Sequence, residues 1–164
     1  MRALTGIEIQ EEHDRLESEA ATALGLMIFE YSRLDMELGL FLSWSDDGKL
    51  MERITKKVAG LNFSKRLEFL QKSVAKKFRD SPDVIERYAR WLADAHAIRE
   101  LRNQLFHGRW GVKATQQVVV NVIGLPTSPD QESTRYSIAE LKSALGSVRE
   151  LRSRLQKLRS SCPV

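Results

Sequence analysis

The spacing of apolar residues predicts long helices near both ends of the chain. Between residues 7 and 44, apolar side chains recur at intervals of three and four, the period of an amphipathic helix. Gly25 lies inside this stretch, so the pattern fits one long helix or two helices that meet at a bend. Near the other end, Ser137 and Glu140 form a capping box, and an apolar stripe runs from there to Leu158.

The middle of the chain has the pattern of three shorter helices. A basic helix is expected over residues 49–58, and a second helix opens at residues 62–64. Ser81 is the expected N-cap of a third helix, with Pro82 in its first position. This helix is expected to run to about residue 106, with Gly108 as the C′ residue that ends it.

A short β segment is expected before the last helix. Residues 118–123 are mostly β-branched and lack a helical period, so they predict a strand that pairs with residues 110–113 as a hairpin. Residues 125–133 contain two prolines and are expected to form a loop. The predicted fold class is mainly all-α: one domain over residues 1–164, a bundle of four to five helices with a small β-hairpin insertion at about 109–136.

The composition is that of an ordinary soluble protein, with 42% hydrophobic and 29% charged residues in 164. The uncharged run at residues 20–29 is too short to cross a bilayer, and the first helix begins with acidic residues rather than a signal peptide. We therefore expect a cytoplasmic protein with no membrane contact. Because there are one cysteine and three histidines, no internal disulfide, metal site or cofactor is expected.

The charge is distributed unevenly along the chain. Residues 48–79 hold ten basic and two acidic side chains, whereas residues 1–47 hold three basic and eleven acidic ones. A basic face attracts phosphates or acidic partners. The same run also fits a solvated helix face that balances the acidic first helix.

Two charges interrupt apolar helix faces. Arg102 falls in the middle of the face that contains Tyr88 and Trp91, and Asp35 lies among the leucines of the first helix. Because a buried charge is costly unless it is paired, Asp35 and Arg102 either form an ion pair or serve another purpose. In the second case, Arg102 faces a cleft or a subunit interface and binds a phosphate there.

A histidine closes the helix that carries Arg102. His107 follows Arg102 by five residues, and Asn103 supplies an amide between them. Histidine is the side chain that most readily transfers protons near neutral pH. The alternative role for His107 is electrostatic capping of the helix dipole.

The stretch at residues 98–108 resembles the signature of the HEPN superfamily: an arginine, a polar residue, a histidine after four intervening positions, and then glycine. Residues 34–38 of the first helix are similar to a recurrent acidic patch of that family. The resemblance implies a metal-independent ribonuclease, often a toxin or defence effector, that dimerises so that both motifs contribute to one composite site.

The resemblance also implies a role for each residue of the motif. His107 would be the general base or acid as a ribose 2′-hydroxyl attacks the adjacent phosphate, Arg102 would hold that phosphate, and Asn103 would orient the two. Further contacts to RNA would come from basic and aromatic side chains beside the motif and in the basic region: Arg109, Trp110, Lys56, Lys57, Lys65 and Arg66.

Two other function classes stay open at this point. The first is a non-catalytic HEPN-like module that binds a nucleotide or a partner protein, such as an antitoxin or a small nucleotidyltransferase of a toxin–antitoxin pair. In that case Asp35 would neutralise Arg102. The second is a helical regulator that associates with DNA, although the chain shows no clear helix-turn-helix pattern.

Overall fold

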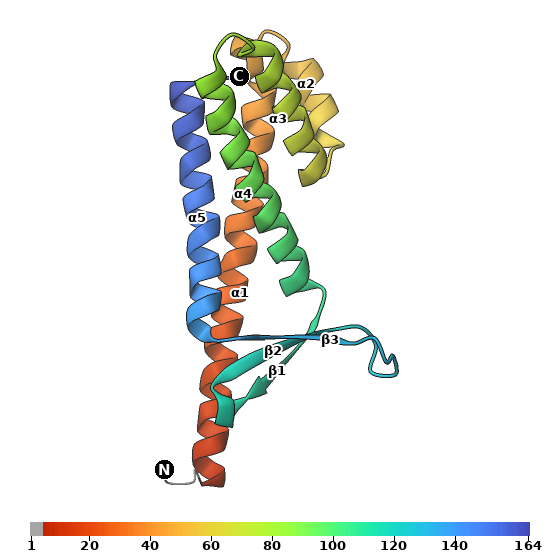
Figure 1. Cartoon of the computed structure of the whole chain (residues 1–164), viewed down its shortest axis with the longest axis vertical. Coiled ribbons are helices and arrows are strands. Elements are labelled where there is room, and N and C mark those ends of the chain that lie inside the picture. Colours follow the sequence, from red (N-terminus) through yellow and green to blue (C-terminus); the bar gives the residue numbers. More distant parts are fainter. Residues whose placement is uncertain (1–4) are drawn as a thin grey trace. The chain divides into compact units, whose positions relative to one another are not determined.

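The computed structural model describes residues 5–164 and is drawn in Figure 1. These residues form five α-helices, two short 3₁₀ helices and three strands, so the prediction of a mainly helical chain with a small β segment is confirmed. The elements in chain order are α1 (Gly6–Ser43), η1 (Ser45–Gly48), α2 (Met51–Ala59), α3 (Phe63–Lys77), α4 (Pro82–Phe106), β1 (Arg109–Lys113), η2 (Ala114–Gln116), β2 (Val118–Ile123), β3 (Glu132–Tyr136) and α5 (Ile138–Ser161).

Capping boxes open the first and last helices. The Thr5 N–H donates to Glu8 Oε2 at 2.7 Å, and the Glu8 N–H donates to Thr5 Oγ1 at 3.3 Å. At the start of α5, the Ser137 N–H donates to Glu140 Oε2 at 2.7 Å, and the Glu140 N–H donates back to Ser137 Oγ at 3.2 Å. The predicted capping box of α5 is therefore confirmed. Helix α1 continues without interruption through Gly25, so residues 6–43 form one helix rather than two.

The three middle helices lie close to their predicted positions. Asn62 caps α3 by accepting a hydrogen bond from the Lys65 N–H at 3.0 Å, and Pro82 is the first residue of α4. Helix α2 begins at Met51, two residues later than expected, because the chain first completes the 3₁₀ turn η1. In that turn Asp46 and Asp47 have positive φ angles of 56° and 55°.

The chain divides into two compact units. We call Met1–Phe29 with Leu101–Gly146 the sheet unit, and Glu30–Glu100 with Ser147–Val164 the helical unit. All three boundaries fall inside long helices, so α1, α4 and α5 each contribute residues to both units.

The helical unit is held together by apolar side chains and a few specific hydrogen bonds. The Trp91 indole N–H of α4 donates to the Leu151 carbonyl of α5 at 2.9 Å, and the Tyr88 hydroxyl donates to the Cys162 carbonyl at 2.6 Å. Burial raises the pKa of the Tyr88 hydroxyl. The fully buried apolar residues of this core include Leu34, Leu38, Leu42, Leu67, Leu70, Trp91 and Leu151.

A buried carboxylate lies between α1 and α5 of the helical unit. Glu30 is 6% exposed and accepts hydrogen bonds from Arg33 at 3.0 Å, from Arg149 at 3.4 Å and from Arg152. Burial acts to raise the pKa of Glu30, but the hydrogen bond and charge of Arg152, helped by the other two arginines, hold this pKa below 4.5. The apolar periodicity of the sequence does not indicate this network.

The sheet unit contains a three-stranded antiparallel sheet in the order β1–β2–β3. Strands β1 and β2 form the predicted hairpin across the 3₁₀ turn η2. Strand β3 was not expected, and the predicted loop over residues 125–133 is wrong at its last two residues, where β3 begins. The strand escapes a pattern-based prediction because four of its five residues are exposed and polar, so backbone pairing with β2 defines it.

The N-terminal part of α1 belongs to the sheet unit and is tied to its other elements. Arg15 donates to the Gln117 side chain, which follows η2, at 3.1 Å, and Lys142 of α5 pairs with Glu19 at 2.8 Å. Buried apolar side chains of this unit include Leu16, Met27, Leu105, Val119, Val120 and Leu141. Within residues 5–164, no helix combines the length and the apolar content needed to span a bilayer.

Candidate functional site

The motif residues Arg102, Asn103 and His107 lie together at the C-terminal end of α4, inside the sheet unit. Arg102 Nη1 donates to Asn103 Oδ1 at 3.2 Å, and its guanidinium carbon lies 5.8 Å from the centroid of the Phe106 ring. His107 is the first residue past the helix, and its N–H donates to the Asn103 carbonyl at 3.2 Å. Arg102 and Asn103 are half-buried, whereas His107 is exposed.

The end of α4 is anchored to the sheet through one carbonyl group. The last carbonyls of a helix have no partner within the helix and need donors from elsewhere. The Leu105 carbonyl accepts one hydrogen bond from the Trp110 indole N–H of β1 at 3.0 Å and another from Asn121 Nδ2 of β2 at 3.3 Å. Since Leu105 lies two residues before His107, these contacts fix the backbone that carries the imidazole.

The glycine that follows the histidine is required by close packing. A Cβ atom on Gly108 would lie 1.9 Å from Asn121 Oδ1 and 2.5 Å from Asn121 Cγ. The Asn121 side chain belongs to a residue that is 2% exposed, so it has little room to move away. The sequence predicted Gly108 as a C′ residue, a position that favours positive φ. In the structure Gly108 is not among the residues with positive φ, and the contact with Asn121 is what excludes a side chain.

Trp110 and Arg109, the two predicted RNA contacts beside the motif, differ in how they are held. The Trp110 indole N–H is used by the Leu105 carbonyl, and its half-buried ring packs against Tyr136 with centroids 5.7 Å apart. Arg109 is exposed and donates to Gln131 Oε1 at 2.9 Å. Trp110 therefore has a structural role, and base binding by either residue stays a prediction.

Asp35 has an ion-pair partner within the helical unit. Arg66 Nη1 of α3 donates to Asp35 Oδ1 at 2.9 Å and to the Asp35 carbonyl at 3.0 Å. The Arg66 side chain is 15% exposed. The sequence suggested that Asp35 pairs with Arg102 and that Arg66 contacts RNA. In the structure the partner of Asp35 is Arg66, and this ion pair explains the acidic residue on this helix face.

The other basic candidates, Lys56, Lys57 and Lys65, are exposed on α2 and α3 of the helical unit. Lys56 pairs with Glu52 at 3.2 Å, and Lys65 pairs with Glu68 at 3.0 Å, so both have a neighbour one helical turn away. The Lys57 ammonium lies 4.7 Å from the Phe69 ring centroid. Their side chains reach solvent, and a role in RNA binding stays a prediction.

A cavity of about 320 Å³ opens in the sheet unit between α1 and the strands β1 and β2. Its wall is mostly apolar and includes Trp110, with His13 and Glu17 at the α1 side. His13, Asp14 and Glu17 bring their possible ligand atoms within 4.8 Å of one another, a spacing that suits a cation. The sequence analysis expected no metal site. Because the two carboxylates are exposed and such groups often gather in solvent, we assign no metal to this cluster.

Asn121 is the residue at this site that the sequence analysis missed. It is the one polar residue in the strand Val118–Ile123, and it is buried. A polar side chain within a run of valines requires a hydrogen-bond partner when it is buried. This interruption of the valine pattern was the available signal, but its partner, the Leu105 carbonyl, is known only from the structure.

Comparison with known proteins does not assign a family. No family model matches the chain, and no curated protein or solved structure gives a match.

Proposed function

We propose that this chain is a metal-independent endoribonuclease of HEPN type that acts as a homodimer with a composite site. The observation that supports this proposal most directly is the end of α4. There an exposed histidine, His107, stands on a backbone anchored at Leu105, beside the hydrogen-bonded pair Arg102 and Asn103. These are a proton-transfer group and a fixed cation, which the cleavage of RNA at phosphorus requires.

The proposed reaction uses the 2′-hydroxyl of the RNA as its nucleophile. His107 accepts the hydroxyl proton while the 2′-oxygen forms a bond to the adjacent phosphorus. The bond from phosphorus to the 5′-oxygen then breaks, and that oxygen takes a proton from an imidazolium. The products are a 2′,3′-cyclic phosphate and a 5′-hydroxyl. The Arg102 guanidinium stabilises the negative charge that grows on the phosphate oxygens, and Asn103 holds the guanidinium by its hydrogen bond.

A second copy of the chain would complete this site. In one chain His107 is exposed, so water surrounds the imidazole and weakens every electrostatic contact to a bound phosphate. A partner related by a two-fold axis would place the same motif opposite the first. It would also supply a second imidazole, so one histidine accepts the proton and the other donates it.

The proposal is tested by RNA cleavage in the presence of a chelator. The proteins compared are wild type, His107→Ala and Arg102→Ala, with His96→Ala as the control because His96 is another α4 histidine outside the motif. We expect His107→Ala and Arg102→Ala to lose activity by about 10²-fold or more, and His96→Ala to retain it. The products should end in a 2′,3′-cyclic phosphate. Equal cleavage by all four proteins, or none by folded wild type, overturns the proposal.

A mixing experiment tests the composite site separately. If both motifs share one site, Arg102→Ala and His107→Ala chains that are mixed and refolded together form heterodimers with one intact residue of each kind. We expect these mixtures to recover part of the cleavage that each variant lacks alone. Sedimentation at micromolar concentration should show dimers, and a monomeric wild type contradicts the composite site.

A binding module without catalysis is the second candidate. The observation in its favour is that Arg102 is half-buried, hydrogen-bonded to Asn103 and placed near the Phe106 ring, which also suits a structural arginine. Such a module would bind a nucleotide or a protein, such as an antitoxin or a nucleotidyltransferase. Folded wild type that cleaves no RNA but is stabilised by a nucleotide in thermal unfolding favours this candidate.

A further inference from the structure

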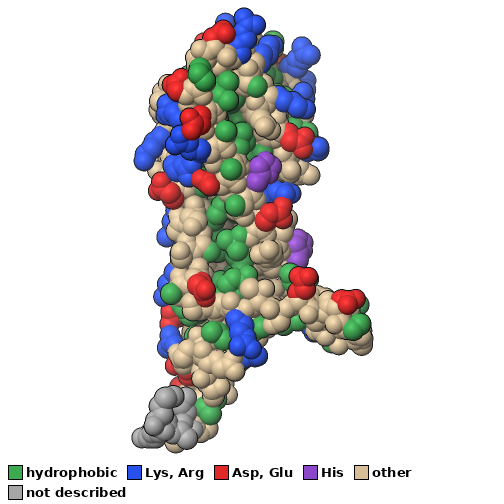
Figure 2. Space-filling view, viewed as in Figure 1, with side chains coloured by type: hydrophobic (Ala, Val, Ile, Leu, Met, Phe, Trp, Pro, Cys, Tyr) green, Lys and Arg blue, Asp and Glu red, His purple; other side chains and the backbone are tan. Residues whose placement is uncertain are grey.

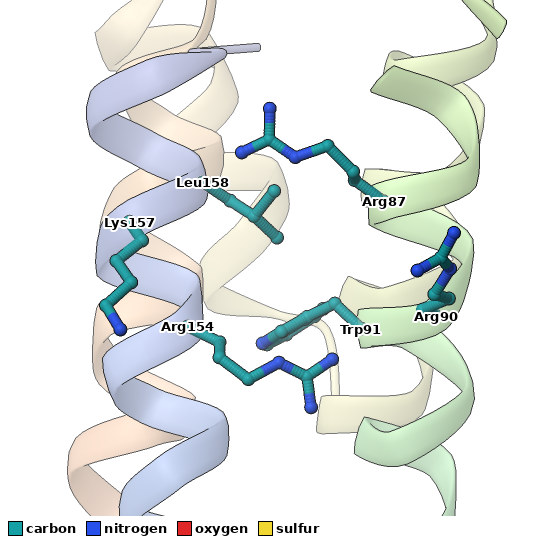
Figure 3. Close-up of a pocket in the computed structure, with 6 residues that line it drawn as sticks. All are labelled: Arg87, Arg90, Trp91, Arg154, Lys157 and Leu158. Atoms are coloured by element: carbon teal, nitrogen blue, oxygen red, sulfur yellow. The ribbon is translucent and has the colours of Figure 1, made fainter. Parts of the chain in front are cut away.

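A second cluster of cationic side chains surrounds a cleft in the helical unit, between α4 and α5 (Figure 3). The cleft has a volume of about 230 Å³. One water molecule takes up about 30 Å³ of liquid volume, so the space accommodates a group of several heavy atoms. The residues that line it are Arg87, Arg90, Trp91, Arg154, Lys157 and Leu158.

The two helices contribute these residues with the same spacing. On α4 the lining positions are 87, 90 and 91, and on α5 they are 154, 157 and 158. Side chains three and four positions apart lie on one face of a helix, so each helix presents two cations and one apolar residue to the cleft. Trp91 and Leu158 are buried at 0% and 6% exposure, and they form an apolar floor. The cations form the rim.

Two of the four cations have a carboxylate partner. Arg90 pairs with Glu86 at 2.5 Å on α4, and Arg154 pairs with Asp94 at 2.6 Å across the two helices. Both arginines retain unused N–H donors, because each of these contacts uses a single nitrogen.

Arg87 and Lys157 have no carboxylate partner within residues 5–164. Arg87 donates to Ser161 Oγ at 3.0 Å and to Cys162 Sγ at 3.3 Å, and neither acceptor is a carboxylate. Figure 3 shows Arg87 reaching from α4 toward α5, and Arg154 reaching from α5 toward α4, on either side of Trp91. The contacts above therefore leave two positive charges of the rim uncompensated. Figure 2 shows Lys and Arg side chains, with some Asp and Glu side chains among them, along the side of the molecule where α5 runs.

We propose that this cleft binds a phosphodiester group of the RNA backbone, which holds the substrate of the proposed ribonuclease; the inference rests on the proposed function. Arginine presents a planar fork of donors that matches the oxygens of a phosphate. The Trp91 ring is 0% exposed, and its N–H is used by the Leu151 carbonyl, so it offers a base neither a stacking face nor a donor. The contact is with the backbone, and it is independent of base sequence and sensitive to salt.

Binding is tested with a single-stranded RNA of about 10 nucleotides, a length that one such site can cover. Its riboses are 2′-O-methylated, so the proposed site cannot cleave it, and its fluorescence anisotropy reports binding. We compare wild type with Arg87→Gln/Lys157→Gln, which removes the two uncompensated charges. Arg33→Gln/Arg159→Gln is the control, since it removes two exposed arginines of the same unit that lie outside both the cleft and the basic run at residues 48–79.

We expect the cleft variant to bind RNA at least about tenfold more weakly and to lose about 0.7 from the slope of log affinity against log salt, the value for one phosphate contact to a single strand. The control variant should bind as wild type does. Arg87→Lys keeps the charge but loses the planar fork of donors. Its RNA affinity should therefore lie between those of wild type and the cleft variant. Thermal unfolding shows whether each variant is folded. Equal binding by the cleft and control variants overturns the proposal.

The outcomes separate this inference from the proposed function. If the cleft variant fails to bind methylated RNA and His107→Ala has no effect on cleavage, the cleft inference stands and the ribonuclease proposal fails. If cleavage depends on His107 but the cleft variant binds and cleaves as wild type does, only the cleft inference fails. Binding of polyglutamate in the cleft with no binding of RNA overturns the choice of ligand in favour of an acidic protein.

Discussion

Replacing Gly108 by alanine tests how the end of α4 is held. The new Cβ would lie 1.9 Å from Asn121 Oδ1 and 2.6 Å from Asn121 Nδ2, and this buried side chain has little room to rotate. The added carbon therefore has one of two effects. It can shift the backbone, and overpacking of this kind costs about 1–3 kcal/mol. Alternatively, it breaks the hydrogen bond from Asn121 to the Leu105 carbonyl, and a buried amide left unpaired costs about 1–3 kcal/mol. Because either outcome costs about the same, we expect Gly108→Ala to lower the free energy of unfolding by about 1–3 kcal/mol.

A double-mutant cycle shows whether Asn121 causes that loss. Asn121→Ala removes the atoms that would clash, and the Leu105 carbonyl retains its hydrogen bond from Trp110. On this background Gly108→Ala should cost less than about 1 kcal/mol, which gives a coupling energy of about 1–2 kcal/mol between the two positions. Urea denaturation of the four proteins measures it. An equal cost of Gly108→Ala on both backgrounds refutes the reasoning, and so does a negligible cost on the wild-type background.

The same four proteins connect the contact to the proposed activity. His107 lies between Leu105 and Gly108, so a backbone shift at Gly108 changes the position of the imidazole. If the proposed function is right, Gly108→Ala reduces RNA cleavage, and the added Asn121→Ala restores part of it. Cleavage that does not follow the coupling would mean that the position of His107 does not limit the reaction.

Three further predictions concern stability. Arg152→Ala removes a close partner of the buried Glu30 carboxylate and should cost about 2–4 kcal/mol at pH 7. The low pKa of Glu30 contributes stability that is present above its unfolded pKa, about 4.5, and is lost as pH falls through its folded pKa. This deficit should therefore hold from pH 7 down to about 4.5 and shrink below that pH in urea titrations; a deficit that stays constant below pH 4.5 contradicts the assignment. Ser137→Ala removes the N-cap of α5 and should cost about 1 kcal/mol in thermal unfolding, and an unchanged melting temperature would mean that the capping box is dispensable. Trp110→Phe keeps a ring against Tyr136 but removes the indole N–H that donates to the Leu105 carbonyl. The free energy of unfolding should fall by about 0.5–1.5 kcal/mol, because Asn121 still donates to that carbonyl. A larger loss of stability would indicate that ring packing dominates.

Local signals determined most of the elements. A cap or a helical period acts between residues three or four positions apart, so it is complete within the sequence itself. The capping box at Ser137, the start of α3 within residues 62–64 and the proline at the start of α4 all occur where the pattern predicts them. The hairpin of β1 and β2 was predicted for the same reason, since its two strands are separated by a short turn.

The candidate site was predicted only in part. The motif placed Arg102, Asn103 and His107 at the end of one helix, and the structure has them there. The sequence does not show what holds that helix end, because the donors to the Leu105 carbonyl come from positions 110 and 121. The reason for glycine at position 108 likewise lies in a contact with a residue thirteen positions away.

The sequence by itself determined which segments become helices, where most of them begin, and which residues form the apolar faces. Only the tertiary structure decided the partners of the charges: Arg66 for Asp35, and three arginines for Glu30. It also brought the cations of α4 and α5 to the rim of one cleft and paired the polar strand β3 with β2. The physical reason is the distance along the chain over which each interaction acts. Periodicity and caps act within one or two helical turns, whereas a charge, a buried amide or an edge strand is satisfied by whichever distant residue the packed core brings near.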